Sequence, residues 1–199
     1  LKLPAAVENV VVGGGGRYLV AQLKTLRQAA IVDVREKKVV KYLPVDDDKF
    51  FIAAGNTKLI IASASKQILS RYDLATGNRE LTTVFSGKPI AGIALGSSSE
   101  GPLFVAQSEY INWNGVFLDL QSLKPLSLTN SGRGPLEFGN NIRVSADGTL
   151  FGSWRDGTSP SGLFLTTITG KSVASIYEHE SVGRVMPGPD ARMVYTGSG

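Results

Sequence analysis

The sequence predicts an all-β protein made of repeated four-stranded units, and three observations support this fold class. Short apolar runs alternate with Gly-, Asn- and Asp-rich turns along the 199 residues. No window shows the 3.6-residue periodicity of an amphipathic helix. One apolar position recurs in steps of 40, 44, 47 and 43 residues, at Leu19, Leu59, Leu103, Leu150 and Met193. A period of about 40–50 residues that carries four strands is typical of β-propeller blades.

Each unit has the same internal order of turns and strands. The first turn reads GGGGR (13–17), GNTK (55–58), GSSSEG (96–101), SADG (145–148) and PGPDA (187–191). The third apolar run ends AIVDV (30–34), RYDLATG (71–77), VFLDL (116–120) and LTTITG (165–170). Gly, Asn and Asp favour such turns because they tolerate positive φ or bond to nearby backbone.

The chain is expected to form one propeller domain or fragment, 1–199, with blades of four antiparallel strands. The blades are predicted at 8–43, 50–84, 90–129 and 141–177, with a partial blade at 183–199. Their strands are expected at 8–12, 17–23, 29–34 and 38–43; 50–54, 58–63, 67–73 and 79–84; 90–95, 102–107, 115–120 and 124–129; 141–144, 149–154, 162–167 and 172–177; 183–186 and 192–196. Segment 19–30 has helical propensity, but its place in the repeat predicts strand, loop and strand.

The two ends of the chain do not complement each other. Residues 1–7 repeat the pattern around Leu43–Pro44 and are expected to form the outer strand of a preceding blade. We therefore expect the chain to form about four and a half blades of a larger ring, for example a ring of seven blades. The alternative is a closed five-bladed ring with a degenerate last blade. Because the chain does not begin with Met, we also expect a processed or truncated product whose parent chain carries further blades or a fused domain.

Composition narrows the function classes. The net charge is +4, but the Lys and Arg residues are dispersed, so no nucleic-acid partner is predicted. The absence of Cys excludes disulfides, thiolate catalysis and Cys-ligated zinc. No apolar run of about 18 residues exists, so no membrane span is predicted. The sequence predicts no compartment, since a cytoplasmic or an extracytoplasmic bacterial protein fits equally.

The third-strand endings carry a family resemblance. RYDLATGNREL (71–81) resembles the end of a WD40 or YVTN-type repeat, where an aromatic–Asp pair precedes a TG turn. Tyr72 stands where WD40 repeats place Trp, and the Asp of the pair recurs at Asp33, Asp73 and Asp119. The GH dipeptide of WD40 repeats is absent, so the chain is more similar to the diverged bacterial WD40-like or YVTN group. That resemblance implies a binding or scaffolding role and no particular reaction.

Three local motifs contain residue types that occur in chemical sites. GGGG (13–16) lacks the Lys-Ser/Thr of a phosphate-binding loop and is predicted to be a hairpin turn. His179 has no second His or carboxylate cluster to complete a metal or acid–base site, so it is interpreted as part of a polar connection. The triplet Asp46–Asp48 is interpreted as a solvated turn, with Ca²⁺ binding or a place at the channel mouth as alternatives. No catalytic residue, cofactor or metal is predicted.

Irregular loops indicate where a binding surface lies. The connections SEYINWNG (108–115), WRDGTSPSG (154–162) and TNSGRGPLEFGNN (129–141) are longer than the equivalent ASK (64–66). Long loops in a regular repeat tend to carry function, and all three should emerge on one face. Trp, Tyr and Arg are enriched at binding hot spots, although Trp also packs between blades. The predicted binding residues are Tyr110, Trp113, Arg133, Trp154, Arg155 and Asp156.

The leading hypothesis is a non-catalytic propeller that binds a protein or peptide through the loops of blades three and four. The alternative is a lactonase-like or glycosidase-like hydrolase with a metal or carboxylates at the central channel. The predicted inner strands offer Glu8, Asn140, Asn141 and Arg143 but no recurring acid. Carbohydrate binding on the Trp-bearing face is a third hypothesis.

Overall fold

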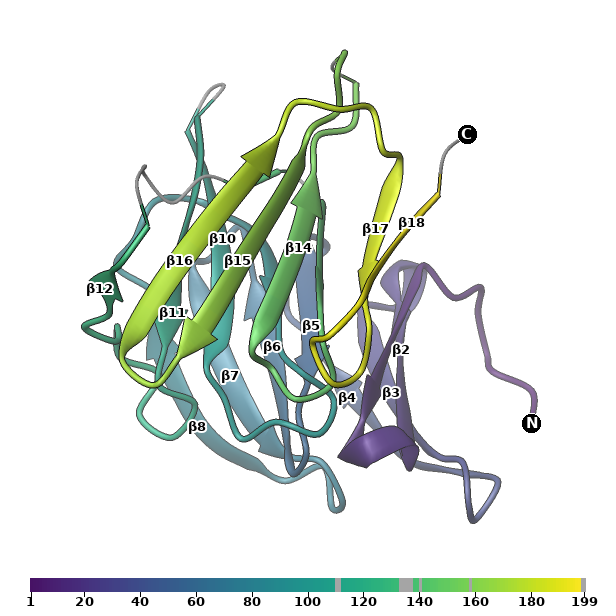
Figure 1. The fold of residues 1–199 in the computed structure, drawn as a ribbon. Helices are drawn as coiled ribbons and strands as arrows, with labels where there is room; N and C mark the ends of the chain where they lie inside the picture. The colour runs from purple at the N-terminus through teal and green to yellow at the C-terminus, as the bar shows by residue number, and fades with distance from the viewer. Residues whose placement is uncertain (110–111, 133–137, 140, 158, 198–199) are drawn as a thin grey trace.

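The computed structural model describes residues 1–109, 112–132, 138–139, 141–157 and 159–197. Consecutive sheets of antiparallel strands follow one another along an open arc that does not close into a ring (Figure 1). The helical segments among the described residues are two 3-10 turns, η1 (Gly14–Gly16) and η2 (Lys24–Leu26). The predicted all-β class with successive blades is therefore confirmed.

Blades one and two are four-stranded sheets, whereas blade three has three strands and the sheet of blade four has five. Blade one contains β1 (Asn9–Gly13), β2 (Tyr18–Leu23), β3 (Gln28–Asp33) and β4 (Lys38–Pro44). Blade two contains β5 (Phe50–Ala54), β6 (Lys58–Ser63), β7 (Ile68–Asp73) and β8 (Arg79–Val84). Blade three contains β9 (Ile90–Ala94), β10 (Leu103–Glu109) and β11 (Asn112–Leu118). Blade four contains β13 (Asn141–Val144), β14 (Leu150–Trp154), β15 (Leu163–Thr169) and β16 (Ser172–Glu178), and the partial fifth blade is β17 (Arg184–Pro187) and β18 (Val194–Gly197).

The predicted fourth strand of blade three, 124–129, is not a regular strand. Pro125 makes an isolated bridge to Leu118, and the amide of Leu126 donates to Phe117. Pro125 has no N–H to donate, so it interrupts a strand ladder. The chain then leaves the blade, and β12 (Thr129–Asn130) pairs in parallel with β16 of blade four.

The N-terminal segment also differs from the expectation. Residues 1–7 form no strand, although an outer strand was predicted there. A strand requires a ladder with a neighbour, and no such ladder accompanies these residues. Leu3 instead packs beside Ala21, Leu23 and Ala30, on the side of blade one that faces away from blade two.

The core lies between neighbouring blades. Tyr18, Val20 and Phe50 belong to the apolar cluster that joins blades one and two. Leu69 and Leu103 belong to the cluster between blades two and three. Between blades three and four the packing is aromatic, through the buried side chains of Phe104, Phe117, Phe138 and Phe151. Each of these blades thus buries the apolar face of its sheet against the neighbouring blade.

The recurring aspartates close the turns after the third strands. The carboxylate of Asp33 accepts a hydrogen bond from the backbone amide of Glu36 at 3.0 Å. In the same way Asp73 accepts one from Thr76 at 2.9 Å, and Asp119 accepts one from Ser122 at 2.7 Å. Gly77 completes the blade two turn at φ 64°. The backbone bond from Glu36 lowers the pKa of Asp33, and the hydroxyl bonds from Thr76 and Ser122 lower the pKa values of Asp73 and Asp119. The turns are therefore held by ionised carboxylates.

Candidate functional site

The strand register brings the irregular connections of blade four to one end of the sheet. Asn141 at the start of β13 pairs with Trp154 at the end of β14. Phe164 near the start of β15 pairs with Tyr177 near the end of β16. We call the surface at this end, formed by residues 141, 154–157, 159–164 and 177–180, the loop face. It contains three of the six predicted binding residues.

A hydrogen-bonded triad positions the carboxylate of Asp156. The indole Nε1 of Trp154 donates a hydrogen bond to one carboxylate oxygen at 2.9 Å, and the side-chain amide Nδ2 of Asn141 donates to the other at 2.7 Å. Trp154 is only 4% exposed, whereas Asp156 is exposed. Trp154 therefore lies within the fold and orients Asp156, whose carboxylate remains at the surface.

A row of aromatic and cationic groups lies beside this triad. The guanidinium of Arg155 sits 4.6 Å from the ring centroid of Phe164, in cation–π range. The Phe164 ring stacks on Tyr177 with centroids 4.6 Å apart. The Tyr177 hydroxyl lies 2.7 Å from Nδ1 of His179. Tyr177 is 45% exposed, so the row reaches from the core to the surface.

Sequence reasoning missed Phe164 and Tyr177. The strand expected at 172–177 includes Tyr177, but no binding role is predicted for it; in the structure Tyr177 lies near the end of β16 (Ser172–Glu178) and faces Phe164 across the ladder. The available signal was the alternation of side chains along the two predicted strands. Once the two strands are aligned, Phe164 and Tyr177 are directly opposed, and directly opposed residues in an antiparallel pair lie on the same face.

The other three predicted residues belong to segments of which the structure describes less. Tyr110 and Arg133 lie outside the described residues. Trp113 is described only by its backbone, which pairs with Ser108 in the β10–β11 ladder. The expected long loop 108–115 is thus mostly an extension of the two strands. The described backbone on both sides, from Ser108–Glu109 to Asn112–Trp113, is paired as in a β-hairpin.

The remaining sequence motifs have structural partners. The GGGG motif forms the turn between β1 and β2 and includes Gly14–Gly16 at positive φ. Asp47 is 5% exposed and accepts the amides of Lys49 and Ser65, each at 2.9 Å. Asp46 forms an ion pair with Lys66. The inward carboxylate of Asp47 therefore ties the connection between blades one and two to the β6–β7 turn.

The described part of the chain contains neither a metal-binding cluster nor a membrane-spanning helix. Among these residues, no group of three or more His, Asp or Glu side chains is arranged to hold a metal ion. No helix within the same residues has the length and apolar character needed to cross a membrane.

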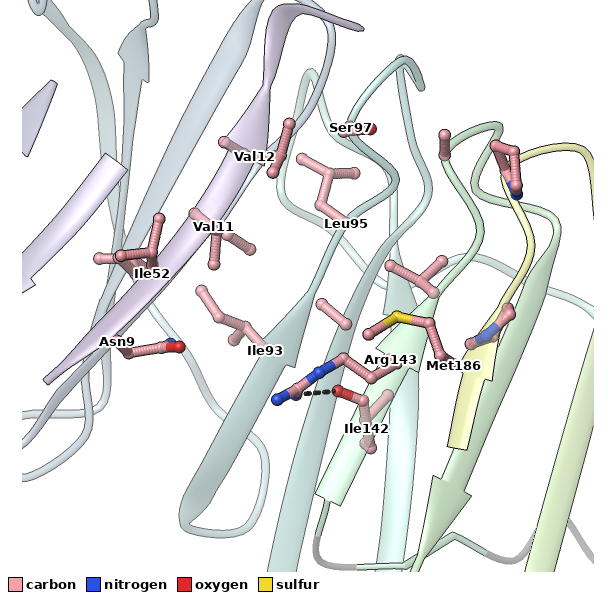
Figure 2. A pocket seen from close by; sticks show the side chains of 18 residues that line it. Asn9, Val11, Val12, Ile52, Ile93, Leu95, Ser97, Ile142, Arg143 and Met186 are labelled. Atoms are coloured by element: carbon pink, nitrogen blue, oxygen red, sulfur yellow. Dashed lines mark hydrogen bonds between the residues drawn. The ribbon is translucent and has the colours of Figure 1, made fainter. Parts of the chain in front are cut away.

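A groove runs along the concave side of the arc, where the inner strands of all five blades meet (Figure 2). It has a volume of about 410 Å³ and is lined mainly by Val, Ile, Ala, Leu, Met and Pro side chains. A second cavity of about 260 Å³ adjoins it at the starts of the inner strands. Asn9 and Arg143 line both cavities, so they stand where the two meet.

Comparisons with known proteins identify the fold class. The chain is similar to hydrazine synthase of Kuenenia stuttgartiensis, with 18% identity and a TM-score of 0.64, over 98% of this chain and 56% of that one. It is similar to the β-propeller domain of Cps50 (Swd1) from Myceliophteria thermophila, with 14% identity and a TM-score of 0.59, over 98% and 65%. It is also similar to U3-55K, with 13% identity and a TM-score of 0.58, over 87% and 50%.

These likenesses establish a β-propeller architecture of which this chain forms an incomplete ring. The chain spans between half and two thirds of the length of the three proteins. No family model matches the sequence. No curated relative matches it either.

Proposed function

We propose that this chain is a non-catalytic binding propeller that contacts a protein or peptide through the loop face and the β10–β11 hairpin. The observation that carries this proposal is the fixed carboxylate of Asp156, which is exposed and held by hydrogen bonds from Trp154 and Asn141. A group held in one orientation loses little entropy on binding, so it contributes affinity more effectively than a mobile one.

The neighbouring groups support the same role. Arg and Tyr are enriched at hot spots, and here Arg155 and Tyr177 both contact the ring of Phe164. The row offers a cation, a phenol hydroxyl and an imidazole within one surface. A partner segment with an acidic or hydrogen-bonding side chain beside an apolar one complements this surface.

The proposal is tested by selecting peptides from a displayed library on the purified chain and measuring their affinities by calorimetry. Arg155→Ala and Tyr177→Ala should each weaken the selected peptides at least about tenfold, the effect of losing a hot-spot side chain. Lys171→Ala is the matched control, because Lys171 is exposed on the same blade at the opposite end of β15 and β16. Its affinity should equal that of the wild type.

The contrary result is equally clear. If both loop-face variants bind the selected peptides as tightly as the wild type, the binding surface lies elsewhere. A circular dichroism melt of each variant must match the wild type, so that lost binding is not lost folding.

We further infer that the blades belong to the diverged bacterial WD40-like or YVTN group. Tyr72 at the WD40 Trp position and the aspartate-closed turns support this assignment. Related sequences that align over all five units should then keep an aromatic–Asp pair at positions 72–73 and lack a Gly-His dipeptide before each blade. Relatives with regular Gly-His and Trp-Asp pairs would contradict it.

A further inference from the structure

We propose that the groove on the concave side of the arc binds a small monocarboxylate with an apolar body. The carboxylate pairs with Arg143, and the apolar body lies along the inner strands. This site adjoins the loop face, since Asn141 lines the second cavity and Trp154 lies against Arg143, but the proposal does not depend on the function proposed for that face.

Arg143 places a positive charge at the wall of both cavities. Its guanidinium donates to the carbonyl of Ile142 at 2.9 Å and lies 5.8 Å from the ring centroid of Trp154. Among the described residues no carboxylate forms an ion pair with it, and none of the residues that line the groove is acidic. Since arginine stays charged at all ordinary pH values, a cation without an acidic partner at the wall of an apolar groove favours an anionic ligand.

A neutral polar group lies across the groove from this cation. Figure 2 shows the carboxamide of Asn9 on the far wall of the groove, directed toward the same space as the guanidinium of Arg143. No hydrogen bond from the Asn9 side chain to another described residue is found. Its side-chain amide is therefore available to donate to a ligand in the same space.

The remaining wall of the groove is formed mainly by apolar residues of the inner strands. From Asn9 to Val12 the first inner strand advances three residues, about 10 Å at 3.3 Å per residue. Val11, Ile93 and Leu95 line this length, and Met186 lies at the wall formed by blade five. The volume of about 410 Å³ falls in the range of small-molecule sites, about 300–1,000 Å³. An extended eight-carbon acid matches this span.

The test is a calorimetric titration of the purified chain with sodium octanoate, with 1-octanol as the neutral counterpart and sodium acetate as the head group alone. Octanoate should bind more tightly than either control ligand. Arg143→Gln should weaken octanoate at least about tenfold, the effect of losing a charged hydrogen bond. The same variant should leave octanol binding unchanged, which separates a lost ion pair from a damaged groove.

Two further variants sharpen the assignment. Met186→Glu places a negative charge beside the apolar wall and should also weaken octanoate; Met186 is 53% exposed, so the change is compatible with folding. Lys171→Gln removes one positive charge far from the groove and should have no effect. Equal losses in Arg143→Gln and Lys171→Gln would show a net-charge effect and overturn the proposal.

Three other outcomes would also overturn it. One is equal affinity of the wild type and Arg143→Gln for octanoate, and another is no measurable octanoate binding. The third is displacement of octanoate by a different occupant of the groove. This would be a second copy of the chain, seen as a dimer by sedimentation, or an apolar peptide that binds more tightly with an amidated than with a free C-terminus.

Discussion

The aromatic interface between blades three and four predicts the effect of adding a single methyl group. A Cβ at Gly115 would lie 2.1 and 2.2 Å from the Cζ and Cε2 atoms of Phe104, well inside van der Waals contact. The Phe104 ring has no room to withdraw, because its centroid lies 5.0 Å from that of Phe117 and 4.4 Å from that of Phe138. Gly115→Ala therefore overpacks a full interface.

The magnitude follows from two opposing effects. Replacing a strand Gly with Ala ordinarily stabilises a protein by about 0.5–1 kcal/mol, because the unfolded chain loses freedom. Overpacking a filled core costs about 1–3 kcal/mol. We expect Gly115→Ala to lower the free energy of unfolding by about 1–2 kcal/mol, a large share of the stability of a typical domain, about 5–15 kcal/mol.

A double-mutant cycle makes the reasoning testable by urea unfolding. Phe104→Leu shortens the side chain that the new methyl meets, so Gly115→Ala in that background should be neutral or stabilising. The coupling between the two changes should be at least about 1 kcal/mol in favour of the double variant. Unchanged stability of Gly115→Ala, or the same loss in both backgrounds, would refute the proposed contact.

Two further predictions concern the polar groups that hold the blades. The pKa values of Asp33, Asp73 and Asp119 are lowered in the fold, so their stabilising contribution is complete above the unfolded pKa of about 4 and is lost as pH falls through the folded values. The urea midpoint should thus be level near neutral pH and fall below about pH 4, with a shallower fall in Asp73→Asn; an identical acid profile in that variant would contradict the linkage. Arg71 donates to the carbonyl of Leu120 at 3.0 Å across blades two and three, so Arg71→Ala should lower the free energy of unfolding by about 1–3 kcal/mol in the same assay, and an unchanged midpoint would refute this inter-blade contact.

The repeat architecture could be predicted because its causes are local. The turns after the third strands depend on one aspartate and an amide three residues later, as at Asp73 and Thr76. Gly77 has a positive φ because its own tight turn requires that conformation, which glycine adopts without steric cost. Such features recur at every turn of the same kind, so the period was visible in the sequence.

The outer edge of blade three could not be predicted in this way. Residues 124–129 have the composition of a strand, but Pro125 interrupts the ladder with β11. Thr129 and Asn130 then pair with Ser172 and Val173 of the next blade. This pairing depends on how blades three and four pack against each other. The local sequence of residues 124–129 carries no information about that packing.

The loop face shows the same division between local and distant causes. The length of the 154–162 connection identified Trp154, Arg155 and Asp156 as its candidates, but residue type left open whether the Trp contacts a partner or packs between blades. Since Trp154 is almost fully buried, its effect on a partner passes through the hydrogen bond to Asp156. Tyr177, from the opposite strand, supplies the aromatic surface instead. In the proposed binding role, exposure set by strand register decides which aromatic contacts the partner and which one holds the carboxylate in place.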